Sequence, residues 1–239
     1  MDVRDKVVLI TGASMGIGLA TARRLAAEGA RLAIVARSAD KLAQIAEELR
    51  GKGGEAIALP ADVRDPAQVR RAVEEAVGHF GRLDVLINNA GQAAAGAVAT
   101  VSPDDFRKIL DLNVFGPLYA MQAAIPVMRG QGGGIIVNVS SMVSRMRIPG
   151  LGAYAATKAA LNMLSDTARG ELSEENIRVI TVLPRITATD FGAHSLGNRD
   201  LRRQQRQSPA TPTDSPEFVA ERILLAVQNE VPEQLMDTP

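Results

Sequence analysis

Short runs of consecutive apolar residues alternate along this chain with longer segments in which apolar residues recur every three or four positions. Val7 to Ile10 is a run of the first kind, which is typical of a strand buried on both faces of a parallel sheet. Residues 66–80 are a segment of the second kind, with Val69, Val73 and Val77 on one face of a predicted helix. The alternation predicts an α/β fold, a doubly wound parallel sheet flanked by helices on both faces.

The same patterns place the remaining elements. Strands are predicted over 31–36, 55–59, 83–87, 135–139 and 177–183, and helices over 19–29, 40–50, 102–128 and 152–172, with a last helix that starts at Ser215. The tail from Val231 is a candidate edge strand. No repeat or linker interrupts the pattern, so we expect residues 1–239 to form a single domain.

The segment over 188–215 differs from the rest because it is polar and rich in arginine. A connection of this length is either a lid over a binding site or a poorly ordered segment. We expect a mobile substrate lid.

Composition narrows the function classes. Lys plus Arg equals Asp plus Glu, at 27 each, so no overall charge recruits nucleic acid or an anionic membrane. The absence of cysteine excludes disulfides and thiol nucleophiles, and two histidines argue against a multi-histidine metal site. The first residues alternate in charge before a short apolar run, unlike a signal peptide or a membrane span. We therefore expect a cytoplasmic protein with no metal, no nucleic-acid partner and no membrane partner.

A glycine-rich turn separates the first predicted strand from the first predicted helix. Small residues in such a turn admit a pyrophosphate, which backbone N–H groups and the helix dipole then hold. Glycine triplets also occur in tight turns and helix caps, but the position between strand and helix indicates a dinucleotide site. The residues assigned to this cradle are Gly12, Ser14, Met15, Gly16, Ile17 and Gly18.

Two charged residues follow the next two strands. Arg37 ends the second strand, where an acid would accept from a ribose 2′-hydroxyl and an arginine accommodates a 2′-phosphate. Because its neighbours are not acidic, the sequence favours NADP(H), with NAD(H) as the second choice; the alternative is that Arg37 is an ordinary solvated cation. Asp62, followed by Val63, is either an acceptor for an adenine amino group or a turn residue.

Asparagines mark two further positions. Asn89, Ala90 and Gly91 end the fourth strand, where they suit bracing of the backbone beside a cofactor, although such turns are common. Asn113 lies four residues before Pro117 inside a predicted helix, so the Asn113 main-chain carbonyl is predicted to lose its helical partner. The alternative is a kink that only fits the core.

The segment from Gly152 to Leu161 carries the strongest candidate for acid–base chemistry. As the start of a helix it places Tyr154 and Lys158 one turn apart on the same face. A phenol loses its proton near pH ~10, whereas acid–base catalysis favours a group that titrates near neutral pH. An ammonium ~4 Å away stabilises a phenolate by roughly 4 kcal/mol and lowers its pKa. Such pairs also arise by chance on surface helices.

Two serines follow the strand over 135–139. Alternation along the strand places Ser141 on the side of Val137 and Val139, and Ser140 on the side of Asn138. Only one serine can therefore face a given pocket, and the alternation does not decide which one.

These residues occur in an order and spacing that resembles the short-chain dehydrogenase/reductase family. The motifs are Thr11-Gly12-x-x-x-Gly16-x-Gly18, Asn88-Asn89-Ala90-Gly91, Asn113, a serine before Tyr154, and Tyr154-x-x-x-Lys158. Each is weak or moderate alone, but the set is highly specific, and the likeness covers nearly the whole chain. The resemblance implies a single Rossmann-like domain that moves hydride between a nicotinamide dinucleotide and a carbonyl or secondary alcohol.

The resemblance also implies individual roles. The family's catalytic serine precedes its tyrosine by thirteen residues, which selects Ser141 over Ser140. Tyr154 would donate the proton in reduction, Lys158 would lower the pKa of Tyr154 and hold the ribose, and Ser141 would orient the carbonyl oxygen. The main-chain carbonyl of Asn113 would hold a water that reaches the lysine. The remaining cofactor contacts implied are Pro184, Thr187 and Thr189.

One departure from the family pattern is Arg185, which replaces a common glycine after the sixth strand. The residues expected near the substrate mix apolar and cationic character, which suits an anionic or a bulky neutral carbonyl compound. The family commonly pairs two long helices between subunits, which implies a homodimer or homotetramer. The sequence thus predicts an NADP(H)-preferring carbonyl reductase; the alternative is a non-catalytic nucleotide-binding sensor or scaffold with the same fold.

Overall fold

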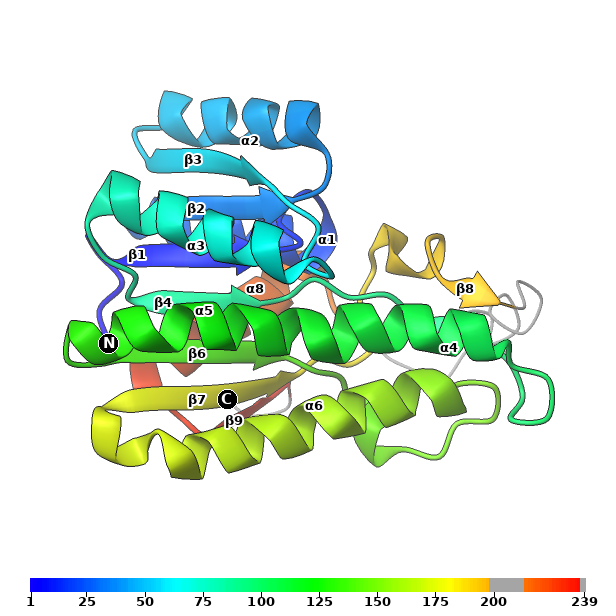
Figure 1. The fold of residues 1–239 in the computed structure, drawn as a ribbon. Helices are drawn as coiled ribbons and strands as arrows, with labels where there is room; N and C mark the ends of the chain where they lie inside the picture. The colour runs from blue at the N-terminus through cyan, green and yellow to red at the C-terminus, as the bar shows by residue number, and fades with distance from the viewer. Residues whose placement is uncertain (198–212, 237–239) are drawn as a thin grey trace.

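The computed structural model describes residues 1–197 and 213–236, and its centre is one parallel sheet (Figure 1). Seven strands lie in the order β3-β2-β1-β4-β6-β7-β9. Their bounds are β1 Val7–Thr11, β2 Arg31–Ala36, β3 Glu55–Pro60, β4 Val85–Asn88, β6 Gly134–Val139, β7 Ile177–Leu183 and β9 Glu233–Leu235. The strand order reverses between β1 and β4, and ligands of such sheets bind where the carboxyl ends of the strands meet this reversal.

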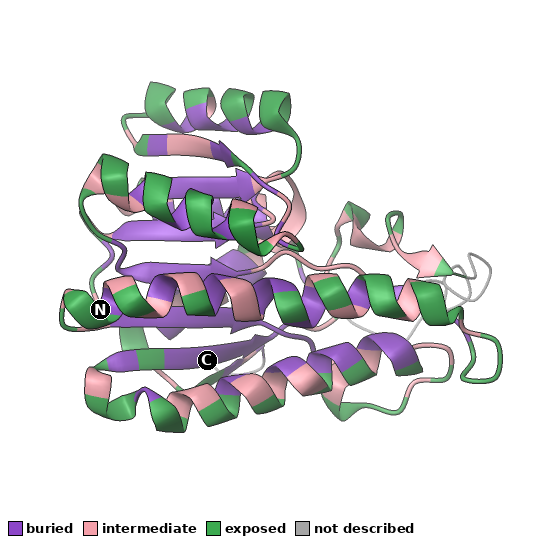
Figure 2. Cartoon of the chain, viewed as in Figure 1, coloured by how far each residue is buried: buried purple, intermediate pink, exposed green. Residues whose placement is uncertain are grey.

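Helices cover both faces of the sheet, as predicted. Helices α1 (Gly16–Ala27), α2 (Ala39–Gly51) and α8 (Pro216–Asn229) contribute to one buried cluster. Helices α3 (Pro66–Phe80), α5 (Gly116–Gly130) and α6 (Gly152–Glu171) cover the other face. The inner strands of the sheet are almost entirely buried, whereas the edge strands β3 and β9 are partly exposed (Figure 2). The α/β fold class predicted from the sequence is confirmed.

The apolar run of β1 explains this arrangement at the level of single residues. Val8 and Ile10 pack with α1, α2 and α8, whereas Val7 and Leu9 pack with the helices of the opposite face. All four side chains are at most 2% exposed, so a polar residue at any of these four positions would be buried. Burial at ~25 cal/mol per Å² of apolar surface stabilises the packing of such a strand between the two layers of helices.

The predicted helix over 102–128 is interrupted. It consists of α4 (Pro103–Leu110), a π-helical turn at Asp111–Phe115 and α5. Gly116 N donates to the carbonyl of Asp111, five residues back, and Pro117 has no N–H to donate. The sequence therefore located the irregularity correctly, and the structure resolves it as a wider turn that contains Asn113.

The carboxyl ends of the strands also carry short elements. A two-stranded sheet joins β5 (Ala94–Ala95) to β8 (Leu196–Gly197), and short 3₁₀ helices span Met142–Arg145 and Asp190–Gly192. A third, Ser173–Glu175, lies at the opposite edge of the sheet, directly before β7. Residues 198–212 of the expected lid lie outside the described residues. The described start of that segment is hydrogen-bonded to the body, because Leu196 N donates to Ala93 O at 2.8 Å.

The end of the chain forms one edge of the sheet. The predicted edge strand is β9, which pairs in parallel with β7. None of the helices in the described ranges is both long enough and apolar enough to cross a membrane.

Candidate functional site

The glycine turn between β1 and α1 forms a cradle that side chains would fill. A Cβ atom on Gly18 would lie 2.3 Å from the carbonyl oxygen of Gly12 and 2.4 Å from Asn89 Nδ2. Gly12 and Gly16 have φ of 68° and 54°, values that side chains disfavour. Bare backbone at a helix N-terminus without acidic residues suits an anion, so the cradle fits a dinucleotide pyrophosphate.

The turn is braced against the end of β4. Asn89 Nδ2 donates to Thr11 O at 3.0 Å and to Gly12 O at 3.2 Å. Thr11 Oγ1 accepts from the main-chain N–H groups of Asn89 and Ala90 at 3.0 and 3.1 Å. The bracing predicted for the asparagine motif is therefore present. Sequence reasoning did not assign a role to Thr11, although the motif begins with it.

The residues predicted to meet the adenine end lie beyond β2 and β3. Arg37 is exposed, and Val63 is buried against Gly116. Asp62 is held by Arg64, whose guanidinium lies 3.0 and 3.1 Å from the carboxylate oxygens through Nε. This hydrogen bonding lowers the pKa of Asp62 and keeps it ionised. Arg64 has no signal of its own in the sequence, and its charge at this end of the site is balanced by Asp62.

Tyr154 and Lys158 project from the first turns of α6 into the protein. They are 8% and 4% exposed, and Lys158 Nζ donates to the carbonyl of Val139 at 2.9 Å. Burial lowers the pKa of Lys158 from 10.5 to about 8. Among the described residues, no carboxylate contributes to the pKa of Lys158.

The expected lowering of the phenol pKa is wrong for the protein alone. Burial raises the pKa of Tyr154 from 10.0 to about 12, and a hydrogen bond with Ser141 opposes the rise only in part. The physical reason is that desolvation of the phenolate is the largest effect, while the ammonium of Lys158 is engaged by Val139 O. Tyr154 is therefore fully protonated at neutral pH.

The two serines after β6 face different partners, as the alternation predicted. Ser141 hydrogen-bonds with Tyr154 and accepts from Val143 N at 3.3 Å. Ser140 Oγ instead donates to the main-chain carbonyl of Lys158 at 3.3 Å. The geometry brings Ser141 to the phenol and leaves Ser140 to anchor α6.

Asn113 joins three segments through its side chain. Its Oδ1 accepts from Gln92 N at 2.9 Å, and its Nδ2 donates to Gln92 O at 2.8 Å and to Thr157 Oγ1 at 3.0 Å. A Cβ atom on Gly91 would lie 3.3 Å from Asn113 Oδ1 and 3.6 Å from Lys158 Nζ. Gly91, Asn113 and Lys158 therefore meet beside the end of β4. The sequence had drawn attention to the carbonyl of Asn113 and had missed Gln92 and Thr157.

The segment after β7 closes the site from the other side. Met142 N donates to Pro184 O at 2.9 Å, and Thr189 lies against Gly16, where an added Cβ would meet Thr189 Cγ2 at 3.1 Å. Thr187 forms an isolated parallel bridge with Asp214. Pro184, Thr187 and Thr189 thus lie between the glycine turn and the segment that follows Ser141.

Arg185, the departure from the family pattern, forms an ion pair. Its Nε and Nη2 atoms donate to Asp214 at 3.2 and 2.9 Å, and the Asp214 side chain is 8% exposed. Main-chain bonds from Asp214 N to Ile186 O and from Ala188 N to Asp214 O join the same segments. The arginine therefore ties the end of β7 to the residues before α8.

The wall around Tyr154 is apolar. The ring of Phe191 lies 5.9 Å from that of Tyr154, and Ala93, Ala94 and Ile109 belong to the same buried cluster. Val143 and Leu196 pack against it. Phe191 and Leu196 come from the segment that the sequence predicted as a lid.

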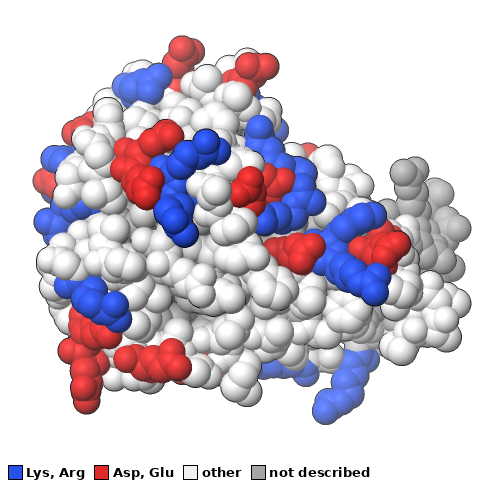
Figure 3. All heavy atoms as spheres, in the orientation of Figure 1, with Lys and Arg blue, Asp and Glu red and all other residues white. Residues whose placement is uncertain are grey.

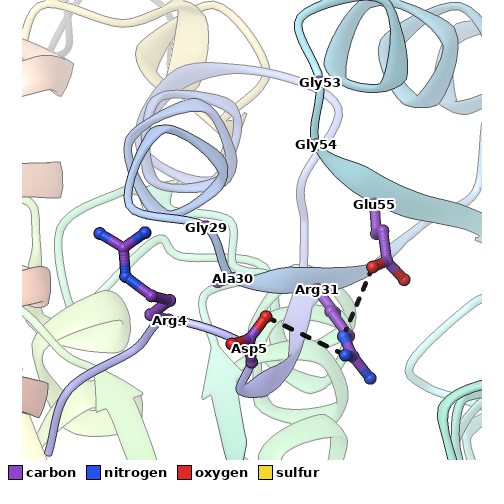
Figure 4. A pocket seen from close by; sticks show the side chains of 8 residues that line it. All are labelled: Arg4, Asp5, Gly29, Ala30, Arg31, Gly53, Gly54 and Glu55. Atoms are coloured by element: carbon purple, nitrogen blue, oxygen red, sulfur yellow. Dashed lines mark ion pairs between the residues drawn. The ribbon is translucent and has the colours of Figure 1, made fainter.

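The surface has one hollow beside the glycine turn and another away from the predicted site. One, of about 440 Å³, is lined by Gly16, Thr189 and their neighbours at the start of α1. The other, of about 250 Å³, lies at the opposite ends of β2 and β3, where Arg31 pairs with Asp5 and Glu55 (Figure 4). No predicted site residue lines this second hollow.

Comparison with known proteins is consistent across sequence and structure. The family model described as short chain dehydrogenase matches residues 6–199. An uncharacterized oxidoreductase of Methylorubrum extorquens is 43% identical over 196 residues, which are 82% of this chain and 78% of that protein.

Two solved structures are similar over nearly the whole chain. A short chain dehydrogenase/reductase from Burkholderia phymatum in complex with NAD has a TM-score of 0.90 and 25% identity, and the match covers 99% of this chain and 90% of that one. The 3-ketoacyl-(acyl-carrier-protein) reductase from Brucella melitensis complexed with NADH has a TM-score of 0.85 and 30% identity over 98% and 96% of the two chains.

Proposed function

The chain belongs to the short-chain dehydrogenase/reductase family of oxidoreductases, and from this premise we propose that it reduces a ketone or aldehyde, or oxidises the corresponding secondary alcohol. The observation that carries the proposal is the meeting of three groups beside the glycine cradle. The Ser141 hydroxyl comes from just beyond the end of β6, and its hydrogen-bond partner, the Tyr154 phenol, comes with the Lys158 ammonium from the start of α6. A bound nicotinamide dinucleotide supplies or accepts the hydride.

Tyr154 and Ser141 handle the carbonyl oxygen. The phenol donates its proton from Oη as negative charge develops on that oxygen, and the hydroxyl of Ser141 holds the oxygen in place. A pKa raised to about 12 keeps the phenol in its donor form at neutral pH. In the reverse direction the phenolate would be the base, and at neutral pH only a small fraction of Tyr154 is in that form.

Lys158 and Asn113 have supporting roles. At neutral pH the pKa of about 8 leaves Lys158 mostly protonated, and its ammonium, beside Gly91, is proposed to hold the ribose of the cofactor. Asn113 holds the end of β4 against α6 through Gln92 and Thr157. We retain the proposal that its main-chain carbonyl in the π-helical turn holds a water for Lys158.

NADP(H) is the proposed cofactor. Arg37 supplies a cation at the adenine end, whereas Arg64 there is paired with Asp62, and no acid stands at residues 36–38 to accept from a ribose 2′-hydroxyl. Titration of the protein with NADPH and NADH tests this, with Arg37→Asp expected to weaken NADPH binding and spare NADH. Equal affinity of the unmodified protein for both would remove the preference.

The substrate is proposed to be a neutral carbonyl compound with an apolar group next to its carbonyl. Phe191, Val143 and Leu196 offer apolar surface around Tyr154. Two of the arginines expected to attract an anion are paired with acids, Arg145 with Glu233 and Arg185 with Asp214.

A homodimer or homotetramer that pairs α5 and α6 between subunits is also proposed. These helices carry few charges on the face shown in Figure 3, and Met163 on α6 is 67% exposed. Phe115 at the start of α5 is 38% exposed and stacks near Tyr119, with ring centroids 6.1 Å apart. Light scattering with Met163→Glu tests this proposal, because a charge at such an interface would dissociate the subunits.

A panel of neutral ketones and aldehydes, each with NADPH and NADH, tests the proposed function. We expect oxidation of NADPH with at least one apolar ketone. The alternative, a non-catalytic nucleotide-binding sensor or scaffold, predicts tight cofactor binding with no turnover of any carbonyl or alcohol in the panel.

A further inference from the structure

A chain of hydrogen bonds connects α6 to the main chain of Ser141. Ser144 Oγ donates to the carbonyl of Ser141 at 2.6 Å, and Ser144 N donates to the same carbonyl at 3.1 Å. The Ser144 hydroxyl in turn accepts from Asn162 Nδ2 at 2.9 Å. Each group in the chain has one consistent direction of donation, because the hydroxyl has a single hydrogen.

Asn162 lies on the same stripe of α6 as the acid–base pair. Positions 154, 158 and 162 follow one another at intervals of four, so their side chains leave one face of the helix. The main chain that carries Tyr154 is thereby connected to the turn that carries Ser141. Among the described residues, other bonds join α6 to β6 and Ser140 without reaching Ser141: Lys158 Nζ donates to Val139 O, Ser140 Oγ to Lys158 O, and Asn138 Nδ2 to Ser165 Oγ.

The orientation of the Asn162 amide has an unusual cost. Its Oδ1 is buried and has no hydrogen-bond partner among the described residues. A buried unpaired acceptor is destabilising, and a chain that needed only packing here would gain from an apolar side chain. The bond from Asn162 Nδ2 to the Ser144 hydroxyl therefore explains why this position carries an amide.

We propose that Asn162 and Ser144 are positioning residues that set the distance between Ser141 and Tyr154, a role that rests on the proposed function. Ser141 contacts the phenol directly, whereas Ser144 and Asn162 act through the Ser141 main chain. Loss of the Ser144 hydroxyl frees the turn Met142–Arg145 to move relative to α6, and small displacements of a catalytic group are costly in rate.

Kinetic measurements on Ser144 variants, made with and without the Ser141 hydroxyl, test this proposal. Ser144→Ala is expected to lower kcat roughly tenfold while the Kd for NADPH stays within about twofold. Ser144→Thr, which keeps the hydroxyl, is expected to retain most of the rate. In a Ser141→Ala background the same Ser144→Ala change should have almost no effect, because the group through which Ser144 acts is gone. Asn162→Asp, of the same shape but without the N–H donor, should match Ser144→Ala.

A spectroscopic readout does not depend on turnover. The chain has two tyrosines, so ¹³Cζ-tyrosine labelling gives one signal for Tyr154 and one for Tyr119. Ser144→Ala and Ser141→Ala are each expected to shift the Tyr154 signal in the same direction, and the double variant should shift it no further. Ser173→Ala is the matched control, because its hydroxyl makes the same kind of bond, to Gly170 O at 2.9 Å, far from the site.

The two possible failures are distinguishable. If the unmodified protein transfers hydride but Ser144→Ala leaves kcat and the Tyr154 signal unchanged, the positioning role is overturned and the proposed function stands. An equal loss of kcat in the presence and absence of the Ser141 hydroxyl overturns it as well. If no carbonyl is turned over, the proposed function fails, and the Tyr154 signal alone decides whether the three residues are coupled.

Discussion

Replacing Lys158 by methionine is expected to remove a pH-dependent destabilisation from the protein without ligand while it abolishes activity. Lys158 is 4% exposed, and burial of its ammonium lowers its pKa from 10.5 to about 8. At ~1.4 kcal/mol for each pKa unit, this difference corresponds to about 3 kcal/mol of destabilisation at pH 7, where the folded protein holds the charge. Methionine has a similar unbranched shape and no charge to desolvate.

The pH dependence separates this effect from other consequences of the substitution. Between pH 8 and 10.5 the unfolded lysine still holds a proton that the folded lysine has lost, so the stability of the unmodified protein rises with pH in this range. The destabilisation from Lys158 should fall from about 3 kcal/mol at pH 7 to about 2 kcal/mol at pH 9. The unpaired carbonyl of Val139 in the methionine variant costs ~1–3 kcal/mol, but this cost does not vary with pH.

Urea denaturation at several pH values between 7 and 9 measures the difference. As pH rises from 7 to 9, we expect the unmodified protein to gain about 1 kcal/mol of stability relative to Lys158→Met. Lys41→Met, at an exposed position of α2, is the control and should show a constant gap. A gap for Lys158→Met that is independent of pH would refute the reasoning, because the buried amine would then carry no altered pKa.

Three further outcomes are expected. Gly18→Ala should weaken NADPH binding, measured by calorimetry, at least roughly tenfold, because the added Cβ would lie 2.3 Å from Gly12 O. The control is Gly78→Ala in α3, which has open space around it and should bind NADPH normally. Arg185→Met should destabilise the fold by roughly 1–3 kcal/mol in urea denaturation, because it leaves the 8% exposed carboxylate of Asp214 without its ion-pair partner. The double variant with Asp214→Leu should recover most of the loss, and no recovery would contradict the ion-pair explanation. Alcohol oxidation should rise steadily from pH 7 to 9, since burial raises the pKa of Tyr154 to about 12, and a plateau below pH 8 in the rate profile would show that another group titrates.

The sequence was sufficient for most of the fold because the buried strands are encoded locally. The runs over 31–36 and 177–183 coincide with β2 and β7, since a strand buried on both faces admits few polar residues. The predicted start of the fourth strand at Leu83 is two residues early. Asp84 is occupied there by Arg82 and by Val7 N at 2.9 Å, contacts that no periodicity reveals.

The parts of the site that depend on a short local motif could be predicted from the sequence. The contacts between residues from distant segments could not. The glycine turn and the Tyr154–Lys158 spacing could be read directly. The Asp62–Arg64 and Arg185–Asp214 pairs depend on which cation meets which acid in space. The direction of the Tyr154 pKa change was missed because the sequence gives the nearby charge but not the extent of burial.

The most direct test of the central claim is a comparison of Tyr154→Phe with the unmodified protein on the best carbonyl substrate of the panel. Single-turnover oxidation of NADPH gives the rate of the chemical step, and calorimetry gives cofactor affinity in parallel. The account predicts that loss of one phenolic oxygen lowers the single-turnover rate by ~10²-fold or more while the Kd for NADPH changes little. A Tyr154→Phe variant that reduces the substrate at the unmodified rate would contradict the claim that Tyr154 donates the proton.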